Sequence, residues 1–179
     1  MNLMQLLMDA AGSQSMAQLG QRAGLDRQAT RSVVEQLAPA LAGGLRRNVA
    51  GAGGLESLAS ALQRGQHQRY LDEPHRLDEP ETVADGNAIL GHLLGSKDVS
   101  RDLAGAAAAR TGVDPGIIKQ MLPLLATLAM GALSKQTNGG QALTGGAEGG
   151  AGGLLTSLLD ADGDGSVVDD VLSMARKFL

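Results

Sequence analysis

The chain has 179 residues, of which 43% are hydrophobic, so it can bury a core and does not belong to the disordered class. It contains no Cys, which excludes disulfides, thiolate zinc sites and cysteine nucleophiles. Its net charge of −4 argues against wholesale electrostatic binding to nucleic acid. With no Trp, one Phe and one Tyr, the core must be built from Leu, Ala, Val and Met, and this composition favours helices over strands.

The N-terminal segment predicts two short helices. Leu residues at helical spacing indicate a first helix over residues 2–11, which a break at Gly12-Ser13 separates from a second helix over 15–23. The first helix carries Asp9 and has no basic region before it, so we do not expect a signal peptide. No apolar run approaches the roughly 20 residues that cross a bilayer, and we expect a cytoplasmic protein.

A longer helix follows, for which Asp26 is a good N-cap and in which Pro39 should produce a kink. Residues 43–54 are rich in glycine and predict a joint before a short helix near 55–63. Together these elements form a first helical repeat over residues 1–64.

Residues 65–84 contain the sequence LDEP twice, are polar and lack helical periodicity, so they predict a linker. Asp85 then caps a helix that ends at Gly95-Ser96, and an Ala-rich helix covers about 98–110. After Gly112, Asp114-Pro115 starts a long apolar helix that Pro123 should kink. The domain limits that follow are a second helical repeat over 85–137, a Gly-rich tether over 138–153, and a C-terminal helix-loop-helix over 154–179.

Three blocks of the second repeat match blocks of the first. Each repeat has a Gly-Ser break, a Gly-Leu-Asp or Gly-Val-Asp break, and one proline inside the following helix. The insertions between blocks are about one helical turn, which leaves the buried face of a helix unchanged. We therefore predict an all-α, multi-helical bundle made from a duplicated three-helix unit, with a C-terminal helical hairpin; chance similarity between Leu- and Ala-rich helices is the alternative.

The segment DGNAILGHLLGSK, residues 85–97, resembles the hallmark of the YidB-like helical proteins, a bacterial family known only as a domain of unknown function. The ending DADGDGSVVDDVL, residues 160–172, is similar to the usual C-terminal ending of that family. The resemblance implies an all-helical bacterial protein. It implies no activity, substrate or catalytic residue.

Asp160, Asp162 and Asp164 precede Gly165 and form the opening of a calcium loop, in which alternate side chains point at one centre. The twelfth position should be a bidentate acid and is Val171, although Asp169 and Asp170 stand next to it. Calcium is therefore the only cofactor that the sequence suggests. The alternative is an acidic turn at the start of the last helix.

Residues 16–37 resemble a helix-turn-helix DNA reader, with Arg27, Gln28 and Arg31 at the start of the second helix, where base edges are read. Against this, Thr30 stands where an apolar packing residue is expected, and the equivalent part of the second repeat has only Lys119 as a basic residue. DNA binding is the less favoured interpretation.

No constellation of a nucleophile, an acid and a base is visible, so we do not expect an enzyme. The favoured hypothesis is a bacterial interaction or assembly protein that packs apolar helix faces on copies of itself, as a homo-oligomer, or on a partner protein. The tether suggests that the tail docks on a neighbouring protomer. A DNA-associated protein and a calcium-responsive module are the two alternatives.

Overall fold

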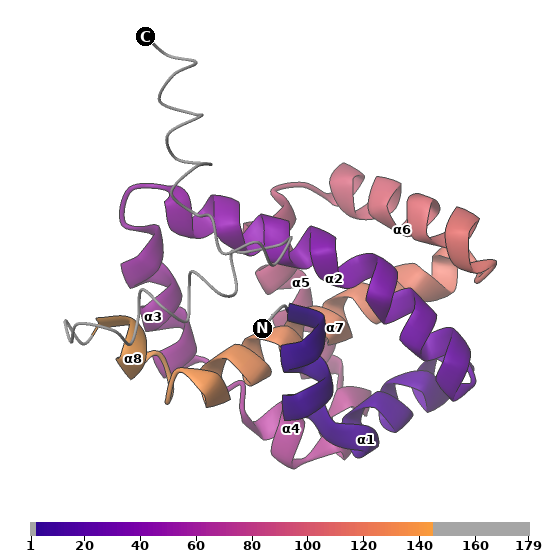
Figure 1. The fold of residues 1–179 in the computed structure, drawn as a ribbon, viewed down its shortest axis with the longest axis horizontal. Helices are drawn as coiled ribbons and strands as arrows, with labels where there is room; N and C mark the ends of the chain where they lie inside the picture. Colours follow the sequence, from indigo (N-terminus) through magenta and orange to yellow (C-terminus); the bar gives the residue numbers. More distant parts are fainter. Residues whose placement is uncertain (1–2, 145–179) are drawn as a thin grey trace, which may run out of the picture.

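The structure is a computed structural model that describes residues 3–144, and every regular element within that range is helical (Figure 1). The all-α class predicted from the sequence is therefore confirmed. In chain order the elements are α1 (Leu3–Ala23), α2 (Arg27–Ala50), α3 (Gly54–Arg64), α4 (Arg69–Asp72), the 3-10 helix η1 (Pro74–Asp78), α5 (Pro80–Leu94), α6 (Lys97–Thr111), α7 (Pro115–Gln136) and α8 (Gln141–Thr144).

Helix α7 runs through the centre of the bundle, and α1, α4, α5 and α6 pack around it (Figure 1). Every residue from 121 to 134 is buried, because this stretch is apolar on all sides of the helix. Within the described part of the chain, α7 is the one helix whose length and composition would allow it to cross a membrane, but 78% of its apolar window is buried inside the protein. A core helix has this pattern of burial.

The break predicted at Gly12 is present as a kink inside α1, where Gly12 has a φ of 61°. The left-handed region is accessible to glycine at no steric cost, so the chain turns there. The second half of α1 ends at Gly24, which has a φ of 66°. Helix α2 then begins as predicted, with Asp26 accepting a hydrogen bond from the backbone N–H of Ala29 at 2.8 Å.

The joint predicted over residues 43–54 is wrong for most of its length, because α2 continues to Ala50. Gly44 lies inside the helix and is buried where α2 crosses α5; a side chain there would overlap the carbonyl group of Leu93. This glycine therefore permits two helices to pack closely and does not bend the chain. The turn into α3 is made farther on, at Gly53, which has a φ of 71°.

Residues 65–84 are not the linker that their composition predicts, because they fold onto the body as α4, η1 and the first turn of α5. Tyr70 and Leu77 are 1% and 0% exposed and belong to the core. The polar residues lie on the outside, where Arg76 pairs with Glu73 at 2.7 Å. A few apolar side chains among many charged ones are enough to fix short helical turns to a core.

Helix α5 begins at Pro80, so the predicted N-cap at Asp85 is wrong: Asp85 lies in the second turn of the helix. The later boundaries agree with the sequence. Helix α5 ends at Gly95 with a φ of 79°, α6 ends at Gly112 with a φ of 73°, and Asp114 caps α7 by accepting a hydrogen bond from its first turn at 2.7 Å.

Helix α8 falls within residues 138–153, the predicted tether, and packs against α3 (Figure 1). The contact is close, since a Cβ at Gly140 would lie 2.8 Å from the carbonyl oxygen of Ala59. Residues 145–179 lie outside the described residues. They include the rest of the tether and the predicted helix-loop-helix over 154–179.

Candidate functional site

An apolar groove of about 150 Å³ lies where α2, α3, α5 and α7 meet. The edge of the buried face of each helix borders this groove. The floor of the groove is therefore made of core side chains and its rim of exposed ones. The lining residues are Leu45 and Asn48 from α2, Ser57, Leu58 and Ala61 from α3, His67 from the following turn, Ile89, His92 and Leu93 from α5, and Met130 from α7.

One wall of the groove is fixed by a hydrogen bond between two helices. The side-chain amide of Asn48 donates to the backbone carbonyl of His92 at 2.8 Å. This carbonyl belongs to the last turn of α5, where backbone acceptors have no partner inside the helix. The bond therefore holds the end of α5 against α2, next to the close crossing at Gly44.

His67 is one of the residues that line the groove. It is 7% exposed, and its Nδ1 atom is buried without a hydrogen-bond partner. Burial lowers the pKa of His67, because a charged imidazole loses hydration there; the carboxylate of Asp85 opposes this effect and Arg69 adds to it. The lining of the groove therefore includes a buried imidazole whose Nδ1 atom has no hydrogen-bond partner.

A polar cluster stands behind His67 and joins α4 to α5. The hydroxyl group of Tyr70 donates to Oδ2 of Asp85, and Arg69 lies 3.2 Å from the same oxygen and 4.9 Å above the Tyr70 ring. Burial and the bond to Asp85 raise the pKa of Tyr70. The three side chains bond to one another, although Nε of Arg69 is buried without a partner, and we interpret the cluster as a structural clamp that positions the turn bearing His67.

The chemistry of the groove is that of binding. Its volume is the size of one or two aliphatic side chains, and most of the surface that lines it is apolar. Among residues 3–144, no group of three His, Asp or Glu side chains is arranged to hold a metal ion.

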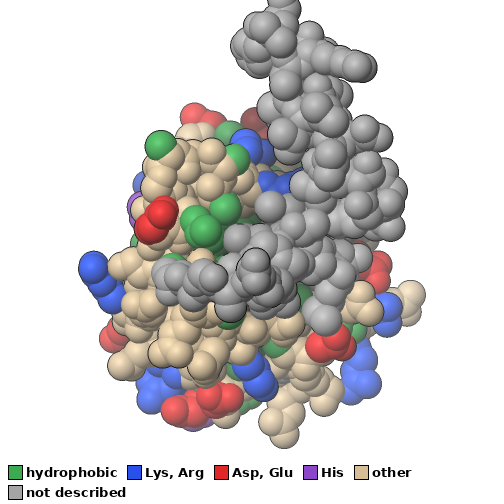
Figure 2. All heavy atoms as spheres, turned by 60° about the vertical axis from the view of Figure 1, so that its left-hand side comes forward, with side chains coloured by type: hydrophobic (Ala, Val, Ile, Leu, Met, Phe, Trp, Pro, Cys, Tyr) green, Lys and Arg blue, Asp and Glu red, His purple; other side chains and the backbone are tan. Residues whose placement is uncertain are grey.

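Figure 2 turns the side of α3 and α8 toward the viewer. Hydrophobic side chains reach the surface in the upper part of this face, with acidic and basic side chains around them, and further charged side chains lie along its lower edge. Two large hydrophobic side chains are exposed elsewhere, Met8 at 36% and Val99 at 43%. Apolar surface is therefore accessible in more than one place.

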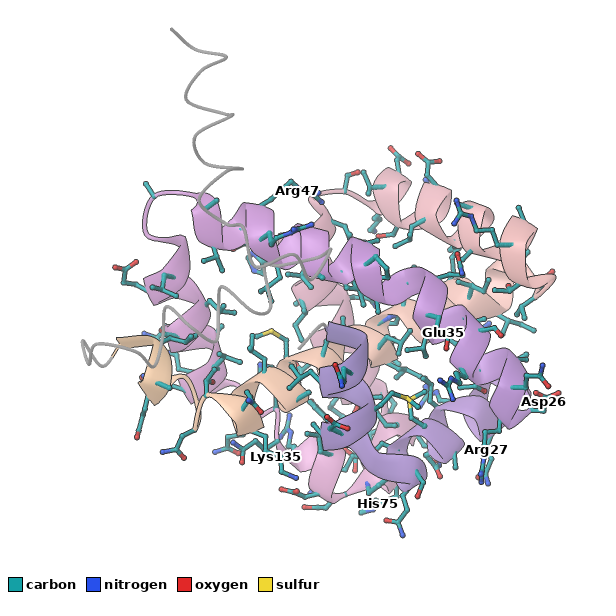
Figure 3. All side chains as sticks on the ribbon, in the orientation of Figure 1. Asp26, Arg27, Glu35, Arg47, His75 and Lys135 are labelled. Carbon is teal, nitrogen blue, oxygen red and sulfur yellow. The ribbon has the colours of Figure 1, made fainter. Side chains whose placement is uncertain are left out.

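The residues predicted to read DNA are all exposed, at the outer end of α2 (Figure 3). Arg27 and Gln28 lie in the first turn, beside the cap Asp26. Arg31 is bound at 2.9 Å to Glu35 on the same helix, so part of the local positive charge is neutralised. The structure brings these three residues to one surface, and Arg110 of the second repeat reaches the same helix, where it donates to Gln36 at 3.3 Å.

Thr30, the polar residue in an apolar position, is accommodated by its surroundings. It is 2% exposed, and its hydroxyl group donates to the backbone carbonyl of Asp26 at 2.7 Å. Gly20 of α1 lies opposite, where a Cβ atom would stand 2.5 Å from the threonine oxygen. The two helices pack closely here because one residue is glycine and the other satisfies its own hydroxyl group.

The predicted calcium ligands, Asp160, Asp162, Asp164, Asp169 and Asp170, lie outside the described residues, so the structure does not place them. Sequence reasoning missed the groove itself, because its lining comes from five separate segments. It also assigned His67 to a linker. One signal was present: the only Tyr of the chain, Tyr70, stands three residues from His67 in a stretch with little other apolar material.

A family model described as "Bacterial protein of unknown function (DUF937)" matches residues 5–136. The match begins in α1 and ends at the last residue of α7, so it includes all the helices that line the groove. No curated protein and no solved structure matches the chain.

Proposed function

The chain belongs to the bacterial family of unknown function DUF937, and we propose that it is a non-enzymatic assembly protein that binds a second copy of itself through the groove between α2, α3, α5 and α7. The observation that supports this proposal is an apolar floor of Leu45, Leu58 and Leu93 that opens to solvent. An apolar side chain from another copy would fill this volume and remove both surfaces from water.

The small size of the groove limits the binding free energy that it can contribute. A single side chain in a groove stabilises a complex by about 1.5–3 kcal/mol, and this alone is too little for a stable dimer. Other exposed apolar side chains, such as Met8 and Val99, would have to contribute to the same interface or to a second one. We therefore expect an assembly that depends on protein concentration.

Light scattering over a range of concentrations tests the proposal. Ala61 lies on the exposed rim of the groove, and Ala61→Glu places a charge there without lowering helix propensity much. Gln63→Glu is the matched control, since Gln63 is exposed on the same helix and does not line the groove. We expect Ala61→Glu to lower the average mass toward that of a monomer and Gln63→Glu to behave as the parent. A parent that is monomeric at every concentration, or an unchanged Ala61→Glu variant, would exclude the proposal.

DNA association is the second proposal, and the exposure of Arg27, Gln28 and Arg31 on one surface favours it. The Arg31–Glu35 ion pair and the acidic net charge stand against it. The double variant Arg27→Glu/Arg31→Glu should abolish binding to duplex DNA at low salt. If this variant binds as tightly as the parent, the helix-turn-helix interpretation fails.

A calcium-responsive function remains a third proposal, supported by the spacing of Asp160, Asp162 and Asp164 in the sequence. Titration calorimetry of the full chain with calcium should show heat that Asp160→Ala removes. The absence of heat at millimolar calcium would end this proposal.

We also propose that the bundle arose by duplication of a three-helix unit. Support comes from glycines with positive φ, Asp caps and in-helix prolines at equivalent places in the two halves. Exchanging the residues that differ in one pair of turns, as Leu25→Val/Val113→Leu, should leave the denaturation midpoint nearly unchanged. A large loss of stability would mean that the two turns are not equivalent. The corresponding features are Gly12 and Gly95, Gly24 and Gly112, the caps Asp26 and Asp114, and the in-helix prolines Pro39 and Pro123.

A further inference from the structure

A cleft of about 570 Å³, larger than the apolar groove, lies between α5, the start of α6 and the start of α7. Its floor includes Leu90 and Leu122, which are 6% and 1% exposed. Three cations stand around it: Lys97 and Arg101 from α6, and Lys119 from α7. The cleft thus combines an apolar floor with a positive rim, although the chain as a whole has a net charge of −4.

Two of the three cations are available to a ligand. Lys97 and Lys119 are exposed and make no hydrogen bond or ion pair within the described residues. Arg101 is bound to Asp98 at 2.7 Å, and the two side chains are 61% and 83% exposed. An ion pair this exposed is weak, so Arg101 can also turn toward an anion in the cleft.

The same chain carries a segment with the complementary composition. Residues 158–171, LLDADGDGSVVDDV, hold five of the 19 acidic residues of the chain and no basic residue. Leucine and valine residues flank these carboxylates on both sides. A segment of this kind offers apolar side chains for the floor of the cleft and carboxylates for its rim.

We propose that residues 158–171 of the same chain dock in the cleft formed by Lys97, Arg101 and Lys119. The connection is long enough, because 13 residues lie between Thr144 and Leu158, and the 14 steps along the chain reach about 46–50 Å when extended. A folded body the size of residues 3–144 has a diameter of about 37 Å. Intramolecular connection also gives an effective concentration on the order of millimolar, so a weak contact is populated.

The test uses engineered disulfides in the full chain, which has no natural cysteine. Ser100 lines the cleft, and Ser166 lies within the acidic segment. The pair Ser100→Cys/Ser166→Cys should form an intramolecular disulfide on mild oxidation in dilute solution with chelator present. Ser57→Cys/Ser166→Cys is the control, since Ser57 is exposed on α3, against which α8 packs just before residue 145. If the tail had no preferred docking place, its attachment beside α3 would favour this control pair.

We expect the Ser100 pair to form about 10-fold faster than the Ser57 pair at low salt. Adding Lys97→Glu/Lys119→Glu should abolish this preference, and adding Asp169→Lys/Asp170→Lys to that variant should restore part of it. Arg27→Glu/Lys135→Glu reverses two exposed cations elsewhere on the molecule (Figure 3) and should change nothing.

Equal rates for the two pairs, or a rate that charge reversal at residues 97 and 119 leaves unchanged, would overturn the proposal. Covalent dimers in place of cross-linked monomers would also overturn it and would favour docking of the tail on a neighbouring protomer. The average mass of the Ser100→Cys/Ser166→Cys sample, in which the apolar groove is unaltered, reports self-association through that groove, so failure of this inference and failure of the proposed function are distinguishable.

Discussion

Gly86 of α5 lies against the backbone carbonyl group of Pro123 in α7, so closely that a Cβ atom at residue 86 would overlap it. Pro123 lies inside α7 and has no N–H to donate, and Gly86 contacts its backbone at the place where α5 crosses. The absence of a side chain at residue 86 therefore sets the distance between the two helices.

Gly86→Ala should lower the free energy of unfolding by about 1–3 kcal/mol, because helix α5 or α7 must move to make room. Gly91→Ala is a matched control on the same helix, where an added Cβ would have no neighbour within 4 Å. This control should raise stability by about 0.5–1 kcal/mol, since alanine loses less conformational entropy than glycine in a helix. Urea denaturation measures both, and a Gly86→Ala variant as stable as the parent would disprove the close crossing.

The sequence predicted those parts of the fold that depend on local signals. The breaks at Gly12 and Gly112 and the caps at Asp26 and Asp114 are where the sequence places them, because each needs only a residue that tolerates its own backbone geometry. The packing between helices could not be predicted from such local signals. Gly44 lies in a stretch whose composition predicts a joint, but in the structure it lies where two helices cross.

The candidate groove could not be predicted for the same reason. It depends on which helices meet, and no local pattern encodes this. Asp85 is an example. Its position before an apolar stretch predicts an N-cap, but α5 begins five residues earlier, and Asp85 accepts a hydrogen bond from Tyr70. A buried tyrosine hydroxyl requires a partner, and only the tertiary structure identifies it.

The Tyr70–Asp85 bond should contribute measurably to stability. Tyr70→Phe removes the donor but leaves Asp85 paired with Arg69, so we expect a loss of about 1 kcal/mol in the free energy of unfolding. Asp85→Ala leaves both Tyr70 and Arg69 without the carboxylate and should cost about 1–3 kcal/mol. Asp72→Ala, which removes an exposed carboxylate in α4, is the control and should change stability little. Equal stability of all three variants would mean that the cluster is not a clamp.

The contact between Gly20 and Thr30 can be tested with a double-mutant cycle. Gly20→Ala should destabilise the protein, because the new methyl group would stand 2.5 Å from the Thr30 hydroxyl oxygen. Thr30→Ala removes that oxygen, so Gly20→Ala should cost at least about 0.5 kcal/mol less in the Thr30→Ala background. Additive effects in chemical denaturation would show that α1 and α2 are farther apart than the structure has them.

His67 should make stability depend on pH in the weakly acidic range. Burial lowers its pKa in the folded protein, whereas in the unfolded chain the pKa is about 6.5. Between the two pKa values the unfolded chain binds the proton and the folded protein does not. The contribution of neutral His67 to the free energy of unfolding is therefore complete above pH 6.5 and is lost as the pH falls toward the folded pKa. For each unit below 6.5 the loss is at most about 1.4 kcal/mol. Urea denaturation at pH 7.5 and pH 5.5 measures it.

His67→Gln cannot take up this proton, so the loss between the two pH values should be smaller in that variant than in the parent. His75→Gln, which removes an exposed imidazole, is the matched control variant. If His67→Gln and the parent lose the same stability on acidification, the imidazole is not buried in its neutral form. The turn that carries His67 would then be open to water, and this part of the groove lining would differ from the structure.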